Sequence, residues 1–143
     1  MLEAQRLLLA FDYGLKRIGV ATGNGLTRTA SPLTTLTADN EPPWTEIDVL
    51  IAEWKPDLIV VGNPGDGADP TLQAALKTFV ETLKDRHAIE IEEVDESFTS
   101  TAAEETLRAG RRKGIYNRRL TRGQIDQHAA CLIAEQWMNQ AFE

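Results

Sequence analysis

Four consecutive aliphatic residues, Leu58-Ile59-Val60-Val61, constrain the fold more than any other stretch of this chain. A strand without polar positions is typical of a sheet that is covered on both faces. A segment with helical period precedes the run and ends at Lys55-Pro56-Asp57, and its shared apolar face consists of Trp44, Ile47, Leu50, Ile51 and Trp54. The pattern therefore predicts a buried strand within a layered α/β structure.

The N-terminal third predicts an antiparallel meander. Residues 7–11, 17–22 and 29–36 have the composition of strands, and the turn around Gly14 joins the first two. Pro32 cannot donate a backbone hydrogen bond, so the third strand is expected at a sheet edge or with a bulge.

Helices and strands alternate after residue 58. Asp69 and Pro70 form a good N-cap and first-turn pair for a helix. The apolar stripe of that helix consists of Leu72, Ala75, Leu76, Phe79, Val80 and Leu83. A fifth strand begins near Ile89. Capping boxes at Thr101 with Glu104 and at Thr121 with Gln124 predict a short helix to about residue 109 and a last helix through residue 137.

This order predicts an α/β fold with a mixed five-stranded sheet, an antiparallel meander plus parallel strands, and helices on both faces. The length of 143 residues fits a single domain over 1–143. No apolar stretch approaches the length of a membrane span, and no secretory pattern precedes Leu7, so a cytoplasmic protein without a membrane partner is expected. Cys131 lies among apolar residues and is interpreted as a buried, inert thiol.

Three acidic residues interrupt the apolar pattern: Asp12, Glu96 and Asp126. Asp12 closes the first strand on the face of Leu8 and Ala10, and Glu96 follows the fifth strand. Asp126 is in register with Ala130 and later apolar residues of the last helix. A half-buried carboxylate is costly without a cation or hydrogen bonds, so one metal cluster assembled by the fold is the favoured interpretation.

Oxygen-only acidic clusters suit Mg²⁺ or Mn²⁺, and a pair of such ions can activate water and stabilise a leaving oxygen in phosphodiester hydrolysis. The alternative is that each acid has a local role: a turn at Asp12, a solvated strand end at Glu96, and a first-turn helix acid at Asp126. His87 is interpreted as exposed, and His128 as lying on another side of its helix.

The charge distribution suggests a polyanion as partner. The formal net charge is −7, yet one segment holds seven basic residues and no acid: Arg108, Arg111, Arg112, Lys113, Arg118, Arg119 and Arg122. Together with Lys16 and Arg17, these residues are candidates for contact with a nucleic-acid backbone. The alternative is a solvated loop whose arginines mainly keep the protein soluble.

Four motifs in order carry a family resemblance: residues 12–21 (DYGLKRIGVA), 61–64 (VGNP), 95–101 (DESFTST) and 126–130 (DQHAA). Over essentially the whole chain, the sequence resembles the YqgF family of small nucleases, also called RuvX. The resemblance implies an RNase H-like fold and an acidic triad at Asp12, Glu96 and Asp126. It also implies 5′-end processing of the small-subunit ribosomal RNA precursor, and relatives have been linked to branched-DNA cleavage and to transcription.

The chain departs from the family pattern at two places and lacks an acid that is usual in a related family. Ser97 replaces a usual arginine, for which the resemblance implies a phosphate contact near the metals; the basic segment could supply that contact instead. Asn63 replaces a usual aliphatic residue. Ala129 and Ala130 occupy positions where related junction resolvases of the RuvC type usually have a fourth acid.

The leading hypothesis is therefore a nuclease that uses Mg²⁺ or Mn²⁺ to hydrolyse structured RNA, most specifically pre-16S rRNA in ribosome biogenesis. The alternatives are a Holliday-junction or branched-DNA nuclease of DNA repair and recombination, and a nucleic-acid-binding module that does not cleave. A sugar-kinase or actin-like phosphotransferase is disfavoured, because those proteins need two large lobes. The oligomeric state is left open, with a homodimer as one candidate.

Overall fold

A computed structural model describes residues 6–39, 41–65, 67–95 and 121–141 of the chain. Its sheet has five strands in the order β3-β2-β1-β4-β5. The strands are β1 (Leu7–Asp12), β2 (Arg17–Asn24), β3 (Thr29–Thr37), β4 (Leu58–Asn63) and β5 (Glu90–Asp95). β2 runs antiparallel to β1 and β3, whereas β4 is parallel to β1 and β5. The predicted mixed sheet, with its meander and its parallel strands, is confirmed.

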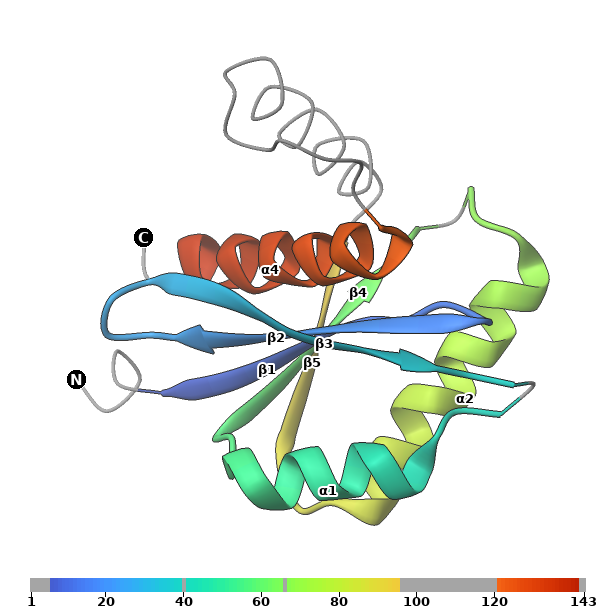
Figure 1. Cartoon of the computed structure of the whole chain (residues 1–143), viewed down its shortest axis with the longest axis horizontal. Helices are drawn as coiled ribbons and strands as arrows, with labels where there is room; N and C mark the ends of the chain where they lie inside the picture. Colours follow the sequence, from blue (N-terminus) through green and yellow to red (C-terminus); the bar gives the residue numbers. More distant parts are fainter. Residues whose placement is uncertain (1–5, 40, 66, 96–120, 142–143) are drawn as a thin grey trace.

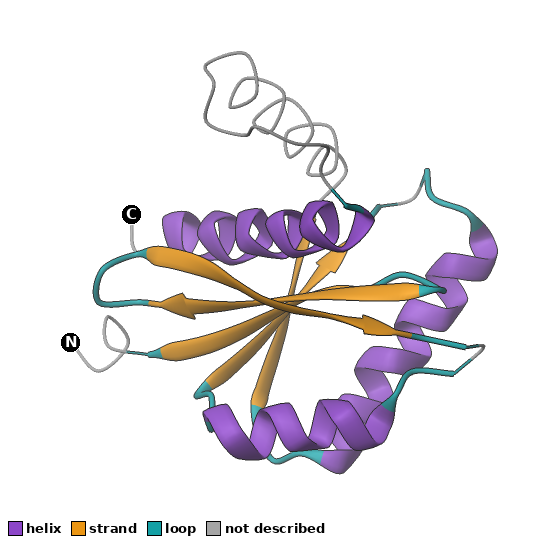
Figure 2. Ribbon diagram, in the orientation of Figure 1, coloured by secondary structure: helices purple, strands orange, loops and turns teal. Residues whose placement is uncertain are grey.

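Helices cover both faces of this sheet, as predicted. α1 (Trp44–Trp54) and α2 (Pro70–Arg86) lie on one face, and α4 (Arg122–Ala141) lies on the other (Figures 1 and 2). β4 lies between β1 and β5, and Leu58 to Val61 are all fully buried. The predicted short helix near residues 101–109 lies outside the described residues. Among the helices in the described ranges, none is both long and apolar enough to cross a membrane.

Large side chains fill the space between the sheet and helices α1 and α2. Phe79 of α2 is 1% exposed and meets three aromatic rings. Its ring centroid lies 6.0 Å from that of Phe11, 4.7 Å from Tyr13 and 5.3 Å from Trp44. Burial raises the pKa of the Tyr13 hydroxyl. This face therefore contributes much of the apolar burial that stabilises the fold.

Small side chains line the opposite face where α4 crosses β2. Gly23 approaches α4 closely, since a Cβ built there would lie 3.5 Å from the Ala134 Cβ. Ala21 packs against Ala130 and Cys131 in the same layer. Leu8, Ala10 and Ile133 extend this core toward β1. The alternation of β1 confirms that Leu8 and Ala10 face α4 while Leu9 and Phe11 face the other helices.

The predicted helix caps and the predicted edge strand are present in the structure. The Asp69 side chain accepts a hydrogen bond from the Thr71 backbone at the start of α2. Thr121 and Gln124 form a reciprocal capping box at the start of α4, with distances of 2.9 and 3.1 Å. β3 is an edge strand, and its pairing with β2 shifts beside Pro32, as expected for a bulge.

Two interpretations were wrong. Trp54 was placed on the buried stripe of α1 but is 37% exposed, because the helix ends there and Ile47 and Ile51 occupy the core side. His87 was interpreted as exposed, yet its side chain is only 17% exposed. Its Nε2 lies 2.8 Å from Asp48 Oδ1, so His87 helps to join the end of α2 to α1.

Candidate functional site

Asp12 lies at the end of β1 on the face that α4 covers. Leu8 and Ala10, four and two residues before it, pack into the α4-side core, and strand alternation places Asp12 with them. In the antiparallel ladder, Asp12 lies opposite Gly19 of β2. Directly opposite residues project to the same face, so the Cβ direction of Gly19 also points toward α4.

α4 approaches the sheet very closely at Gly19. A Cβ built on Gly19 would lie 2.1 Å from the backbone oxygen of Asp126 and 3.1 Å from its Cβ. Real Cβ atoms do not come so close to a carbonyl oxygen, so only glycine permits this contact. Gly19 thus adjoins Asp12 within the sheet and Asp126 above it. Residues 12 and 126, far apart in sequence, meet around this one glycine.

Arg17 belongs to the same cluster. Its Nε donates a hydrogen bond of 2.8 Å to Asp126 Oδ2, and the two side chains are 37% and 20% exposed. Arg17 precedes Gly19 by two residues and therefore lies on the same face of β2. Sequence reasoning placed Arg17 among the phosphate contacts and did not foresee this ion pair. Arg17 and Gly19 are two residues apart in one strand and project to the same face, and this spacing is the signal that could have indicated the pair.

Thr35 fixes the first turns of α4 to the sheet. It lies opposite Gly19 on β3, which gives a row of Asp12, Gly19 and Thr35 across three strands. The Thr35 hydroxyl donates to the Gly123 carbonyl oxygen at 2.8 Å and accepts from Gln127 Nε2 at 3.1 Å. Sequence analysis missed these residues, because nothing in a polar edge strand identifies its partner on a helix 88 residues later.

Other predicted site residues are only partly covered by the structure. Glu96 and the basic residues from 108 to 119 lie outside the described ranges. β1, β4 and β5 are parallel, so their carboxyl-terminal ends lie on the same side of the sheet. β5 therefore ends at Asp95 on the side where β1 ends at Asp12. Lys16 and Arg122 are exposed. Within the described ranges, no three His, Cys, Asp or Glu side chains form a group that could hold a metal ion.

Cys131 and the Nε2 atom of His128 are buried on α4. Burial raises the pKa of the Cys131 thiol to about 11, with the nearby Glu135 carboxylate adding to the shift. This agrees with the prediction of an inert thiol, because the thiolate is the reactive form. The Nε2 atom of His128 is buried and has no hydrogen-bond partner in the described part of the chain.

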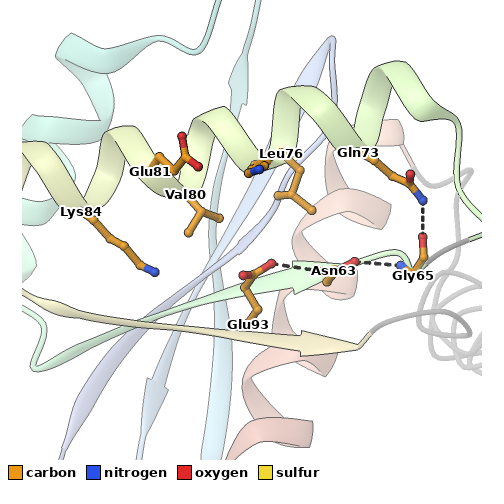
Figure 3. A pocket seen from close by; sticks show the side chains of 9 residues that line it. Asn63, Gly65, Gln73, Leu76, Val80, Glu81, Lys84 and Glu93 are labelled. Carbon is orange, nitrogen blue, oxygen red and sulfur yellow. Dashed lines mark hydrogen bonds between the residues drawn. The ribbon is translucent and has the colours of Figure 1, made fainter.

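Asn63, one of the departures from the family pattern, lies in a separate cleft between α2 and the parallel edge of the sheet (Figure 3). The cleft has a volume of about 470 Å³. Asn63 donates to Glu93 Oε1 at 3.1 Å and accepts from the Gly65 backbone at 2.9 Å, while Gln73 donates to the Gly65 carbonyl at 2.7 Å. These amides pair with neighbouring protein groups and hold the loop after β4. Asn63 is therefore a loop-positioning residue here.

Two of the three predicted metal ligands, Asp12 and Asp126, lie beside Gly19. Asp12 and Asp126 offer carboxylate oxygens, which are the ligands that Mg²⁺ and Mn²⁺ prefer. The Asp126 carboxylate has a cationic partner in Arg17.

Comparison with known proteins gives relatives that match almost the full chain. A protein of Aeromonas hydrophila is 40% identical over 142 residues, covering 97% of this chain and 99% of the relative. One of Paraburkholderia phymatum is 42% identical over 135 residues, covering 92% and 84%. Both are named "Putative pre-16S rRNA nuclease".

Solved structures share the fold at low sequence identity. RuvC of T. thermophilus, solved in complex with a Holliday junction substrate, matches with a TM-score of 0.59 and 13% identity over 95% of both chains. Fowlpox virus resolvase, solved with Holliday junction DNA, matches with a TM-score of 0.58 and 11% identity, over 96% of this chain and 99% of that one. These matches, together with the sheet order, confirm the predicted RNase H-like fold.

The family model described as "RuvX: Holliday junction resolvase" matches residues 6–140, which include β1 with Asp12, β2 with Gly19 and α4 with Asp126. The chain therefore belongs to the RuvX family.

Proposed function

We propose that this protein is a nuclease that uses Mg²⁺ or Mn²⁺, in a pair of ions, to hydrolyse phosphodiester bonds of structured RNA. The specific reaction that we favour is 5′-end processing of pre-16S rRNA. Relatives near 40% identity over almost the whole chain are named for that activity. The observation that carries the proposal is the convergence of Asp12 and Asp126 on Gly19.

In this proposal, Asp12, Glu96 and Asp126 hold the ions. Bound ions would lower the pKa of a coordinated water and neutralise charge on the reacting phosphate. The close approach at Gly19 holds the Asp126 backbone against β2, beside the end of β1, and the Thr35 hydroxyl holds the start of α4 through the Gly123 carbonyl. The basic residues of 108–122, together with Lys16 and Arg17, would bind the nucleic-acid backbone without reading its sequence.

The test is a cleavage assay on precursor rRNA with Asp12→Asn and Asp126→Asn variants. Loss of a metal ligand should exceed the 10- to 100-fold effect typical of outer-shell partners, so we expect cleavage to fall by at least about 100-fold. RNA binding in the presence of a chelator should change little. Asp85→Asn, an exposed acid on α2, is the matched control and should cleave at the wild-type rate. Wild-type cleavage by Asp126→Asn would refute the mechanism.

Branched DNA is the second candidate substrate. The family description names Holliday junction resolvase, and the two resolvases of similar fold are solved with junction DNA. A panel of precursor rRNA, single-stranded DNA and four-way junctions, each with Mg²⁺ and with Mn²⁺, separates the candidates. Faster cleavage of the junction than of precursor rRNA would favour a branched-DNA nuclease of DNA repair and recombination. Tight binding without metal-dependent turnover on any substrate would favour a non-cleaving module.

Three further parts of the proposal concern the whole molecule. We propose a single domain over 1–143, a cytoplasmic location where ribosomal precursors are processed, and a homodimer as one candidate assembly. Light scattering after size-exclusion chromatography tests the assembly directly, and a monomer at assay concentrations would exclude it.

A further inference from the structure

We infer that Arg17 is a positioning residue with two alternative partners: the Asp126 carboxylate when no metal is bound, and a substrate phosphate when it is. The inference rests on the proposed function, since it takes Asp126 as a metal ligand. It goes beyond a general phosphate contact, because it couples metal binding to substrate binding through one side chain.

The first support is the geometry of the ion pair. The Arg17 Nε approaches Asp126 Oδ2 at 2.8 Å, a normal distance for a charge-assisted hydrogen bond. Among the described residues, the contact uses one guanidinium nitrogen and one carboxylate oxygen, rather than the bidentate form of the strongest arginine–carboxylate pairs. The terminal nitrogens of a guanidinium are suited to phosphate, so the pair leaves them available for a second partner.

The second support is that α4 does not need this ion pair to dock. The Thr35 hydroxyl bridges to Gly123 and Gln127 of α4, and Ala130, Ile133, Ala134 and Met138 of the helix are fully buried. A pair with one side chain 37% exposed adds little to stability in comparison. Arg17 therefore contributes little to the docking of α4, and its main effect at this position comes from its positive charge.

The third support is direct competition at one oxygen. A guanidinium that occupies Asp126 Oδ2 repels a divalent cation and uses a lone pair that the cation needs. Binding of metal to Asp126 must therefore weaken or displace the hydrogen bond from Arg17. Because Arg17 lies on the same face of β2 as Gly19, the freed side chain stays beside the site where a phosphate would be cleaved.

Competition predicts opposite effects of one substitution on two ligands. In Arg17→Gln, Mn²⁺ measured by titration calorimetry or electron paramagnetic resonance should bind about tenfold more tightly, the order of effect of one nearby unit charge in a partly exposed site. Binding of precursor rRNA with Ca²⁺ in place of the catalytic ion should weaken, with its salt slope reduced by about 1. Lys16→Gln is the matched control: it removes a neighbouring exposed charge and should weaken RNA binding but leave Mn²⁺ affinity nearly unchanged.

A spectroscopic measurement on the unmodified protein gives a second test that does not depend on the variant folding. The Arg17 Nε proton should exchange slowly with solvent in metal-free protein, because it is donated to Asp126. Titration with Mg²⁺ should shift its resonance and speed its exchange. An Nε resonance that Mg²⁺ saturation leaves unchanged would overturn the inference, as would an Arg17→Gln variant whose Mn²⁺ affinity is unchanged or weaker.

Asp126→Asn separates failure of this inference from failure of the proposed function. If Mn²⁺ binding survives Asp126→Asn and Asp12→Asn unchanged, the metal site itself is wrong. If those variants lose Mn²⁺ and Arg17→Gln does not gain affinity, the metal site stands and only the role of Arg17 fails.

Discussion

The two faces of the sheet are packed with side chains of different size. On the face of α1 and α2, large rings around Phe79 fill a thick layer. On the face of α4, Gly19, Ala21 and Gly23 let the helix backbone approach the strand almost to contact. Aromatic layers bury more area per residue, whereas small residues fix the distance between two backbones.

This difference assigns separate tasks to the faces. A carboxylate on α4 can meet one on β1 only if the helix approaches closely and in a fixed register. Asp126 is the residue whose backbone rests on Gly19, so its position follows from that contact. Neither Asp12 nor Asp126 projects into the layer of large side chains, since both lie on the α4 side of the sheet. Stability and site geometry should therefore respond to different substitutions.

Truncation on the aromatic face should give the largest loss of stability. Phe79→Ala removes a ring that is 1% exposed and should lower the free energy of unfolding by about 3–5 kcal/mol. In the folded fraction, Mn²⁺ affinity should stay within about twofold of wild type, because affinity follows the site rather than global stability. Urea unfolding and calorimetry check both values, and Leu26→Ala, at 63% exposure, is the neutral control. A matching loss of Mn²⁺ affinity would break the comparison between the faces.

Gly19→Ala should cost less stability but damage the site more. The new Cβ would lie 2.1 Å from a backbone oxygen that cannot rotate away, so α4 must shift. Overpacking of this kind typically costs about 1–3 kcal/mol. We expect loss of Mn²⁺ binding and cleavage beyond what that stability change explains.

Substitutions at two other glycines serve as controls for Gly19→Ala. At Gly23 the nearest atom to a new Cβ is a Leu8 side-chain carbon at 2.7 Å, which can move, so Gly23→Ala should be milder. At Gly67 no atom of the described residues lies within 4 Å of the new Cβ, and Gly67→Ala should be nearly neutral. Equal effects at Gly19 and Gly67 would contradict the close-approach argument.

A small effect, confined to stability, is expected at the joint between α1 and α2. Asp48 receives hydrogen bonds from Arg86 and His87, and the Arg86 contact is the main reason that the pKa of Asp48 lies below its usual range. A carboxylate with a lowered folded-state pKa stabilises the protein above its unfolded pKa of about 4, and the contribution is lost as pH falls through the lower folded value.

Asp48→Asn should therefore lower stability by less than about 1 kcal/mol at pH 6, in the range of exposed ion pairs. The difference from wild type should shrink as the pH is lowered from 5 to 2. Urea midpoints across this range measure it. A difference in stability that is constant with pH would show that Asp48 acts by packing alone. A change in Mn²⁺ affinity in Asp48→Asn would contradict the separate tasks of the two faces.

Local and periodic signals in the sequence predicted most of the fold. The aliphatic run at 58–61 indicated a strand covered on both faces, and the capping box at Thr121 identified the start of α4. Ends were less predictable: β2 runs to Asn24 and β4 to Asn63, because ladder partners extend a strand beyond its apolar core. Trp54 shows the same limit, since a helical stripe does not reveal where the covering layer stops.

The sequence by itself determined the element order, the position of Asp12 on the face of Leu8 and Ala10, and the family. These depend on period, composition and motifs, which are local properties of the chain. Only the tertiary structure decided that Gly19 joins residues 12 and 126, that Thr35 anchors α4, and that Arg17 pairs with Asp126. Such contacts join residues 88 to 109 positions apart, and their partners are set by how a helix crosses a twisted sheet.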